Sequence, residues 1–235
     1  MRTAAVVPAA GRGERLGPGA PKALREIAGQ PLLAHSVRAL AEARSVDIVV
    51  VAAPVGEQSA VRSLLDPVVA DTELMVVAGG ETRQQSVALA LQVLPDDVDV
   101  VLIHDAARPL VPVETVDAVA AAVRGGADAV VPAVAIVDTI KRVDAAGRVE
   151  GSVDRSTLRA AQTPQGFARI VLESAHRSAA DDGVDDTTDD AGLVERAGHP
   201  VMVIPGSDDG FKVTRPIDLV LAEAVLARRR SAGVH

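Results

Sequence analysis

The sequence TAAVVPAAGRGERLGPGAPK, residues 3–22, decides the fold. It begins as a short β-branched apolar run without polar alternation, which is typical of a parallel strand buried on both faces. Glycines and other small residues follow directly. After a first parallel strand, such residues let backbone amides approach an anion, because they place no bulk beside the ligand. The stretch therefore predicts an α/β fold whose first loop is a candidate phosphate cradle.

The rest of the chain repeats this alternation. Apolar runs predict strands at Ala4–Val7, Asp47–Ala52, Leu74–Val77, Val100–His104, Ala129–Val134 and Val201–Val203. Helical spacing of apolar residues predicts helices at Leu32–Ala43, Gln58–Leu65, Gln84–Leu94, Val113–Arg124, Ala168–Ala180, Ala191–Arg196 and Pro216–Arg229. Because buried strands that alternate with helices form a parallel sheet covered on both faces, we expect a doubly wound α/β fold with a mainly parallel sheet.

Two stretches interrupt the alternation. Residues 138–159 are polar around a turn-like DAAG at 144–147, which predicts a projecting β-arm that needs a partner to cover its edges. Residues 181–190 hold six aspartates without the ligand spacing of a calcium loop, so we expect a solvated loop that ends in a helix cap at Thr187 or Thr188. Since no Pro-, Gly- or Ser-rich linker divides the chain, residues 1–235 are predicted to form one domain.

Composition excludes several functional classes. The net charge of −8 and the absence of Trp and Tyr argue against nucleic-acid binding, which needs a basic face and stacking platforms. Without cysteine, the chain has no thiol nucleophile and no disulfide, which favours the cytoplasm. The apolar runs are too short to span a membrane, and the N-terminus lacks the pattern of a signal peptide.

Lysine is scarce in this chain. Lys22, Lys141 and Lys212 stand against 21 arginines, a bias typical of GC-rich coding. Under such a bias, arginine replaces lysine at positions where both residues function equally well. A lysine that is retained therefore marks a position that needs a compact ammonium group. Lys22 lies in the glycine-rich loop with Arg12 and Arg15, so a net-acidic chain gathers three cations there. A phosphate cradle and a solvated basic loop both fit these residues.

Familiar catalytic and metal motifs do not occur. The loop lacks the Gly-Lys-Ser/Thr of a P-loop, and its glycines miss the G-x-G-x-x-G register. The histidines show no metal-ligand spacing, and no nucleophile-elbow pattern appears, so we expect all five histidines to be bystanders.

Two further segments follow predicted strands. Gly79 and Gly80 precede a helix, where their backbone groups could meet the edge of a planar base or simply form a tight turn. Asp105 and Arg108 lie beyond the carboxyl end of the strand Val100–His104, where open parallel sheets bind ligands. Asp105 could hold a ribose hydroxyl, a substrate hydroxyl or Mg²⁺, or it could only cap the turn with Arg108 as its partner.

The motifs together resemble a known family. PAAG at 8–11 with Gly13, Arg15 and Lys22 resembles the nucleotide-binding signature of the sugar-phosphate nucleotidyltransferases, in particular the 2-C-methyl-D-erythritol 4-phosphate cytidylyltransferase family of the non-mevalonate isoprenoid pathway. Later motifs follow in the family's order: GGETRQQSV (79–87), HDAARP (104–109), DTIK (138–141), VDR (153–155), QTPQ (162–165), TDD (188–190) and KVTRP (212–216). The chain departs from the family at Glu81, where Asp or Ser is common, and at Gly210-Phe211, where Asn-Ile is usual.

The resemblance implies a Rossmann-like nucleotidyltransferase domain that transfers CMP from CTP to 2-C-methyl-D-erythritol 4-phosphate and releases pyrophosphate. Arg15 and Lys22 are expected at the α-phosphate, with Mg²⁺ held mainly by the CTP phosphates and Asp105 as a candidate ligand. The implied nucleotide-binding residues are Pro8, Ala9, Ala10, Gly11, Gly13, Gly79, Gly80, Glu81, Ser86, Asp105 and Ala106.

The resemblance also implies a homodimer in which the β-arm completes the partner's site. Arg155, acting from the other subunit, and Lys212 are expected to position the acceptor phosphate. Thr139, Thr163, Thr188, Asp105 and Arg108 are candidates for the acceptor's hydroxyls and phosphate.

Two alternative functions remain open. A cytidylyltransferase for another polyol phosphate, such as ribitol 5-phosphate, shares the nucleotide half of these motifs and differs only on the acceptor side. A nucleotide-binding module without catalysis is the rival from another class. Loss of Arg15, Lys22 or Lys212 would favour that module, and all three residues are present.

Overall fold

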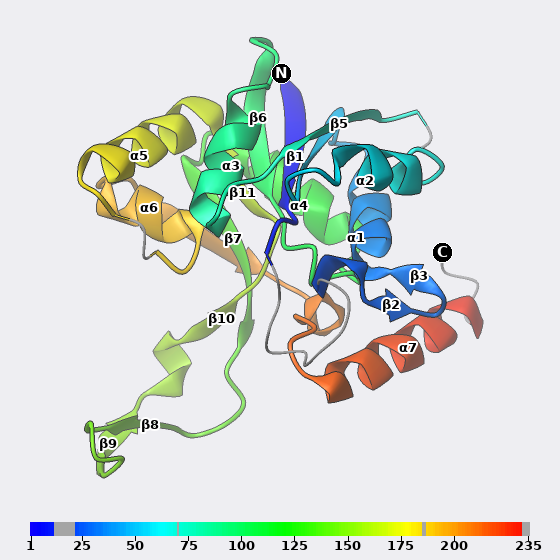
Figure 1. Ribbon diagram of the computed structural model, residues 1–235. Coiled ribbons are helices and arrows are strands. Elements are labelled where there is room, and N and C mark those ends of the chain that lie inside the picture. The colour runs from blue at the N-terminus through cyan, green and yellow to red at the C-terminus, as the bar shows by residue number, and fades with distance from the viewer. Residues whose placement is uncertain (12–21, 70, 185–186, 232–235) are drawn as a thin grey trace.

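The computed structural model of the chain describes residues 1–11, 22–69, 71–184 and 187–231 (Figure 1). Its main sheet contains β1 (Arg2–Pro8), β4 (Ile48–Ala53), β5 (Glu73–Ala78), β6 (Val98–Ile103), β7 (Ala129–Ala135), β10 (Arg159–Ala161), β11 (Gln165–Ala168) and β12 (Val201–Pro205). β1 lies between β4 and β6, and these pairs, like β4 with β5 and β7 with β12, are parallel. β11 runs antiparallel between β6 and β7. The sheet is mainly parallel, as predicted.

Seven α-helices occur in the described part of the chain: α1 (Leu32–Ala41), α2 (Gln58–Leu65), α3 (Arg83–Leu91), α4 (Val113–Arg124), α5 (Arg169–Asp181), α6 (Asp190–Arg196) and α7 (Pro216–Ser231). Every strand and helix predicted from the sequence is present, with boundaries within three residues of the prediction. No helix within the described ranges is long and apolar enough to cross a membrane.

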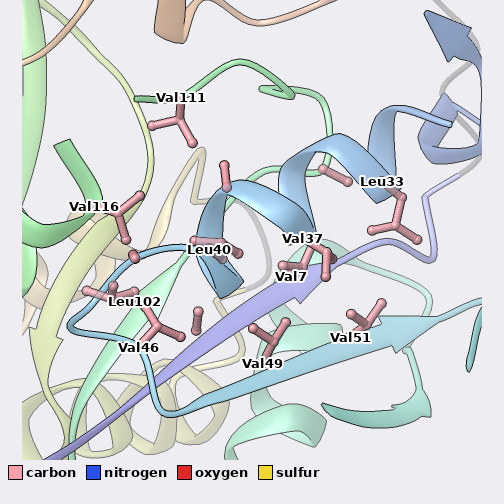
Figure 2. Close-up of a cluster of buried hydrophobic side chains, with 14 of the residues drawn as sticks. Val7, Leu33, Val37, Leu40, Val46, Val49, Val51, Leu102, Val111 and Val116 are labelled. Carbon is pink, nitrogen blue, oxygen red and sulfur yellow. The ribbon is translucent and has the colours of Figure 1, made fainter. Parts of the chain in front are cut away.

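Two hydrophobic clusters cover the two faces of the sheet because successive strand residues point to opposite sides. Ala5 and Val7 of β1 pack with α1, α2 and α4, as Figure 2 shows around Val7, Val37 and Leu40. Ala4 and Val6 face the other way and pack with α3, α5 and α6. The doubly wound architecture predicted from the sequence is confirmed.

The segment between β7 and β10 projects away from the sheet (Figure 1). At its far end β8 (Ile140–Val143) and β9 (Val149–Val153) pair antiparallel around a turn in which Gly147 has a positive φ of 78°. Val143 and Val149 are more than half exposed there. The described chain thus leaves apolar side chains uncovered on this arm.

Besides the strands of the arm, four short strands of the described chain were not predicted individually, among them β10, which pairs antiparallel with β7. β2 (Glu26–Ile27) and β3 (Gln30–Pro31) form a small hairpin beside α7, and β11 inserts Phe167 into the core. These segments have only two to four residues, too few for a periodic pattern. The helix cap expected at Thr187 or Thr188 is wrong, because Asp189 accepts the hydrogen bond from the Gly192 amide (3.0 Å) at the start of α6.

Candidate active site

A cleft of about 200 Å³ lies beyond the carboxyl ends of β1, β5 and β6. The described residues that the sequence assigns to nucleotide binding and that line it are Pro8, Ala9, Ala10, Gly11, Gly80, Glu81, Ser86, Asp105 and Ala106. Lys22 and Lys212 line it as well. A larger hollow of about 870 Å³ lies between α1, α7 and residues 109–114, but none of the described residues assigned to the site lines it. The smaller cleft is therefore the candidate active site.

The loop from Gly79 to Thr82 is held rigidly against the first strand's loop. A side chain on Gly79 would place its Cβ 2.5 Å from the Ala10 Cβ, so only glycine fits between the two segments. The Ser86 hydroxyl accepts from the Gly80 amide (3.1 Å) and donates to the Thr82 carbonyl (2.9 Å). Ser86 thus shapes the wall of the cleft through this loop, whereas its assignment to direct nucleotide binding stays a prediction.

Three cations surround the Asp105 carboxylate. Lys212 Nζ lies 2.7 Å from Oδ2, Arg83 Nε lies 3.6 Å from Oδ1, and Arg108 Nε lies 3.8 Å from Oδ2. Burial alone would raise the pKa of Asp105, but the charges of Lys212, Arg83 and Arg108 outweigh it and hold the pKa far below its ordinary value. Asp105 is therefore ionised throughout the physiological range.

His104 and Thr163 fasten the turn that carries Asp105. His104 Nε2 donates to the Arg108 carbonyl (3.2 Å), so Nδ1 accepts from the Thr163 hydroxyl (3.0 Å). The same hydroxyl accepts from the Asp105 amide (3.0 Å). Burial lowers the pKa of His104 to about 4, so the ring is neutral. His104 therefore has a structural role in this turn, and the Thr163 hydroxyl donates its proton to the ring.

Arg108 joins two segments beneath the cleft. Its Nη1 donates to the Gly210 carbonyl (2.8 Å) and its Nη2 to the Ala161 carbonyl (3.1 Å). Within the described ranges, its Nε is the one buried side-chain nitrogen or oxygen without a hydrogen-bond partner. Burial lowers the pKa of Arg108. The described contacts make Arg108 a brace, and its role in acceptor binding stays a prediction.

Several predicted residues are not part of this cleft in the described chain. Thr139 and Arg155 lie exposed on the arm, where Arg155 Nη1 donates to the Val137 carbonyl, and Thr188 is exposed before α6. Gly13 and Arg15, as well as Arg12, lie outside the described residues. The roles of Thr139, Arg155, Thr188, Gly13 and Arg15 therefore stay predictions.

Sequence reasoning missed Arg83 and Gln162. Arg83 lines the cleft and spans two carboxylates, because its Nη1 pairs with the buried Asp190 (2.5 Å) while its Nε faces Asp105. Asp190 also accepts from His176 Nε2 (2.9 Å). Gln162 is buried beside the loop that carries Lys212. Both residues lie within the quoted motifs, but the contacts are long-range and leave no local signal in the sequence.

Metal-binding residues are sparse in the described part of the chain. It contains no group of three or more His, Asp or Glu side chains that could hold an ion. Asp105 and Glu81 are carboxylates that line the cleft, and carboxylate oxygen is the ligand that Mg²⁺ prefers. A Mg²⁺ that takes most of its ligands from a bound triphosphate fits this donor set.

Fold and cleft together define a doubly wound α/β protein whose cleft lies at the carboxyl ends of its parallel strands, where open sheets of this kind bind their ligands. The family model described as 2-C-methyl-D-erythritol 4-phosphate cytidylyltransferase matches residues 3–228. The chain therefore belongs to that family, as the motifs predict.

Individual relatives agree. The chain is 58% identical, over 97% of its own length and 86% of the relative's, to the 2-C-methyl-D-erythritol 4-phosphate cytidylyltransferase of Streptomyces coelicolor. It resembles the crystal structure of the enzyme of that name from Thermus thermophilus with a TM-score of 0.77 and 35% identity, over 96% of this chain and 98% of the other. The 4-diphosphocytidyl-2C-methyl-D-erythritol synthase of Anaerococcus prevotii, at 24% identity and a TM-score of 0.83 over 96% and 98%, shares the fold.

Proposed function

We propose that this chain transfers the CMP group of CTP to the phosphate of 2-C-methyl-D-erythritol 4-phosphate. The products are 4-diphosphocytidyl-2-C-methyl-D-erythritol and pyrophosphate. Family membership supports the activity. The observation that carries it is that two of the chain's three lysines, Lys22 and Lys212, line one cleft with the glycine-rich loops.

The chemistry needs positioning and charge more than proton transfer. A sugar phosphate is already anionic and nucleophilic near neutral pH, so its oxygen can attack the α-phosphorus and expel pyrophosphate in one step. The difficulty is to bring two polyanions together and to stabilise the charge that develops at the α-phosphorus. A cleft that presents lysine ammonium groups and backbone amides meets both needs.

The nucleotide half of the cleft is assigned to the base and the triphosphate. Backbone groups of Gly79–Glu81 are assigned to the cytosine edge and the first-strand loop at Pro8–Gly11 to the phosphates, and Gly80, Glu81 and Pro8–Gly11 line the cleft. Lys22, with Arg15, is assigned to the α-phosphate and its transition state. When Mg²⁺ binds with the nucleotide, it screens the triphosphate oxygens, and Asp105 is the candidate protein ligand.

The acceptor half is assigned to Lys212 and to residues outside this cleft. Lys212 is held at 2.7 Å from Asp105 and is 38% exposed, so its ammonium can reach an incoming phosphate. Arg155 and Thr139 lie on the exposed arm, and we propose that a homodimer places them in the partner's site. The more than half-exposed Val143 and Val149 support such a contact, because apolar side chains on an arm favour burial against a second surface. We place the enzyme in the cytoplasm, since a chain without cysteine suits a reducing compartment.

A kinetic assay of pyrophosphate release tests this function. Purified enzyme with CTP and Mg²⁺ is given 2-C-methyl-D-erythritol 4-phosphate or ribitol 5-phosphate, and we expect kcat/KM to favour the first strongly. Replacing CTP by UTP should also lower turnover, because polar groups that pair with the exocyclic amine are left unpaired. Preference for ribitol 5-phosphate would assign the chain to another polyol phosphate. CTP binding by titration calorimetry without pyrophosphate release would assign it to a non-catalytic module.

A further inference from the structure

The loop that carries Lys212, residues 206–212, is held from outside the cleft. We propose that Gln162 is a positioning residue that sets the place of the Lys212 ammonium through this loop. The proposal rests on the proposed function only in assigning Lys212 to the acceptor phosphate. Gln162 is 5% exposed and does not line the cleft, so it acts through the loop and not on the substrate.

The side-chain amide of Gln162 makes two hydrogen bonds to the backbone of Ser207, one through its nitrogen and one through its oxygen. Its Nε2 donates to the Ser207 carbonyl (2.8 Å), and the Ser207 amide donates to its Oε1 (3.0 Å). The Gln162 backbone amide in turn donates to the Pro132 carbonyl of β7 (2.8 Å). The Gly206 amide still reaches β7 directly, through the Ala133 carbonyl (2.9 Å), and at the next residue the Gln162 side chain takes over the attachment of the loop to the sheet.

Two glycines let the loop wrap closely around this amide. A Cβ on Gly206 would lie 2.4 Å from Gln162 Oε1, and a Cβ on Gly210 would lie 3.2 Å from the same atom. Position 210, where the family usually has Asn, is attached here through its backbone. The Gly210 carbonyl accepts a hydrogen bond from Arg108 Nη1 (2.8 Å). The departure at Gly210 therefore leaves the loop's attachment intact.

Other contacts hold the remaining points of the loop. Asp209 pairs with Arg228 (2.8 Å) and Arg229 (3.0 Å) of α7, and the Val213 amide donates to the Ala107 carbonyl (2.8 Å). Gln162 holds Ser207, which lies between the end of β12 and these attachments. Without it, the first half of the loop loses its two hydrogen bonds to Gln162, while Lys212 must still meet Asp105 and an acceptor. A misplacement of about 1 Å in a reacting geometry can cost about a hundredfold in rate.

Gln162→Met tests the proposal, because methionine keeps the length of the side chain and removes both hydrogen bonds. We expect kcat/KM for the acceptor to fall by about 10- to 100-fold per folded molecule, the range typical of residues that support a binding group. The KM for CTP should stay within about twofold. If Gln162→Met does not yield folded protein, Gln162→Asn, which withdraws the amide by one methylene, is assayed instead.

Asp117→Leu is the matched control. Asp117 accepts from the Ser45 amide (3.0 Å) and hydroxyl (2.7 Å), so it clamps a loop at the opposite end of the parallel strands. Its loss also removes two hydrogen bonds that a side chain makes to one residue of a loop, and it does not touch the Lys212 loop. We expect lower stability and wild-type kinetics per folded molecule.

A second measurement does not depend on activity. A lysine-specific endoprotease can cut this chain only after Lys22, Lys141 and Lys212. In Gln162→Met, cleavage after Lys212 under native conditions should become about tenfold faster or more, because two lost hydrogen bonds ease local opening. Cleavage after Lys141 on the arm is the internal standard, and Asp117→Leu should match the wild type at Lys212.

These two measurements separate the possible failures. If the wild-type protein releases no pyrophosphate, the proposed function is wrong. The cleavage rates then test the role of Gln162 on their own. Unchanged cleavage after Lys212, or kinetics in active Gln162 variants that match the wild type, would overturn the positioning role.

Discussion

At the residue scale, the site is organised around one buried carboxylate. Asp105 lies among three cations, Lys212, Arg83 and Arg108. The buried Asp190 carboxylate holds Arg83 in place. Burial would raise the pKa of Asp190, but the charges and hydrogen bonds of Arg83 and His176 together outweigh burial and lower it. Such a framework is suited to receive polyanions, since its charges are fixed before the substrate arrives.

Lys22 is the residue whose loss should affect chemistry most selectively. We predict that Lys22→Ala lowers kcat by about 10² to 10⁴, the range typical of removing one preorganised charge from a transition state. Lys22→Arg should also be impaired, because a broad guanidinium fork does not replace a compact ammonium. Steady-state kinetics measures both variants. Full activity in Lys22→Arg would refute the assignment and the inference drawn from scarce lysines.

His104 makes stability depend on pH. The folded state holds the pKa of this ring near 4, below its ordinary 6.5, so the unfolded state binds an extra proton between these values. The free energy of unfolding should therefore fall, by roughly 3 kcal/mol in total, as pH drops from 6.5 to 4. Urea titrations across this window check the slope. His104→Gln should flatten it only in part, because His35, whose pKa burial also lowers, adds to the slope. An unchanged slope in His104→Gln would show that folding does not lower the pKa of this ring.

At the element scale, long periodic segments could be read from the sequence and short ones could not. The strand at Ala4–Val7 and the helix at Val113–Arg124 carry enough residues for a pattern, and both form as expected. β11 has four residues and runs antiparallel inside a mainly parallel sheet. It is too short for a periodic pattern, and alternating strands and helices predict only parallel strands. At the site, motif resemblance located the residues that line the cleft, whereas Arg83 and Gln162 act through partners about 20 to 107 positions away, which no local pattern encodes.

Gly166 of β11 lies where a side chain would collide with α4. A Cβ there would lie 2.5 Å from Val119 Cγ1 and 3.0 Å from Val123 Cγ2, because α4 packs directly on the strand. We predict that Gly166→Ala destabilises the fold by about 1 to 3 kcal/mol, the usual cost of overpacking a core. Chemical denaturation measures the change. Gly151→Ala in β9, where a Cβ meets no atom within 4 Å, is the control and should be near neutral.

A double-mutant cycle identifies the cause of the Gly166 effect. Adding Val119→Ala to Gly166→Ala removes the atom that the new methyl meets, so the two changes should be less destabilising together than their sum. If the two changes in unfolding free energy are additive, the destabilisation by Gly166→Ala does not come from contact with Val119.

At the scale of the whole molecule, the arm is the element proposed to connect one chain to another. If Arg155 serves the partner's site while Lys22 serves its own, each single-variant homodimer is inactive. A dimer with one Lys22→Ala chain and one Arg155→Ala chain has one site with both lesions and one with neither. An equal mixture should therefore recover about a quarter of wild-type activity, because about half of randomly reassembled dimers are mixed. Mass spectrometry of isotopically labelled chains must first show that subunits exchange. If they do and activity stays absent, Arg155 does not complete a partner's site.

The central claim is that the cleft catalyses direct displacement at the α-phosphorus by positioning two anions among fixed cations. The stereochemical course of the reaction tests this claim directly. The substrate is CTP in which sulfur replaces one α-phosphate oxygen, with known configuration at the α-phosphorus, and phosphorus NMR gives the configuration of the product. A single in-line attack by the acceptor phosphate predicts inversion at the α-phosphorus. Retention would contradict the claim, because it requires two displacements and hence a covalent nucleotidyl-enzyme intermediate.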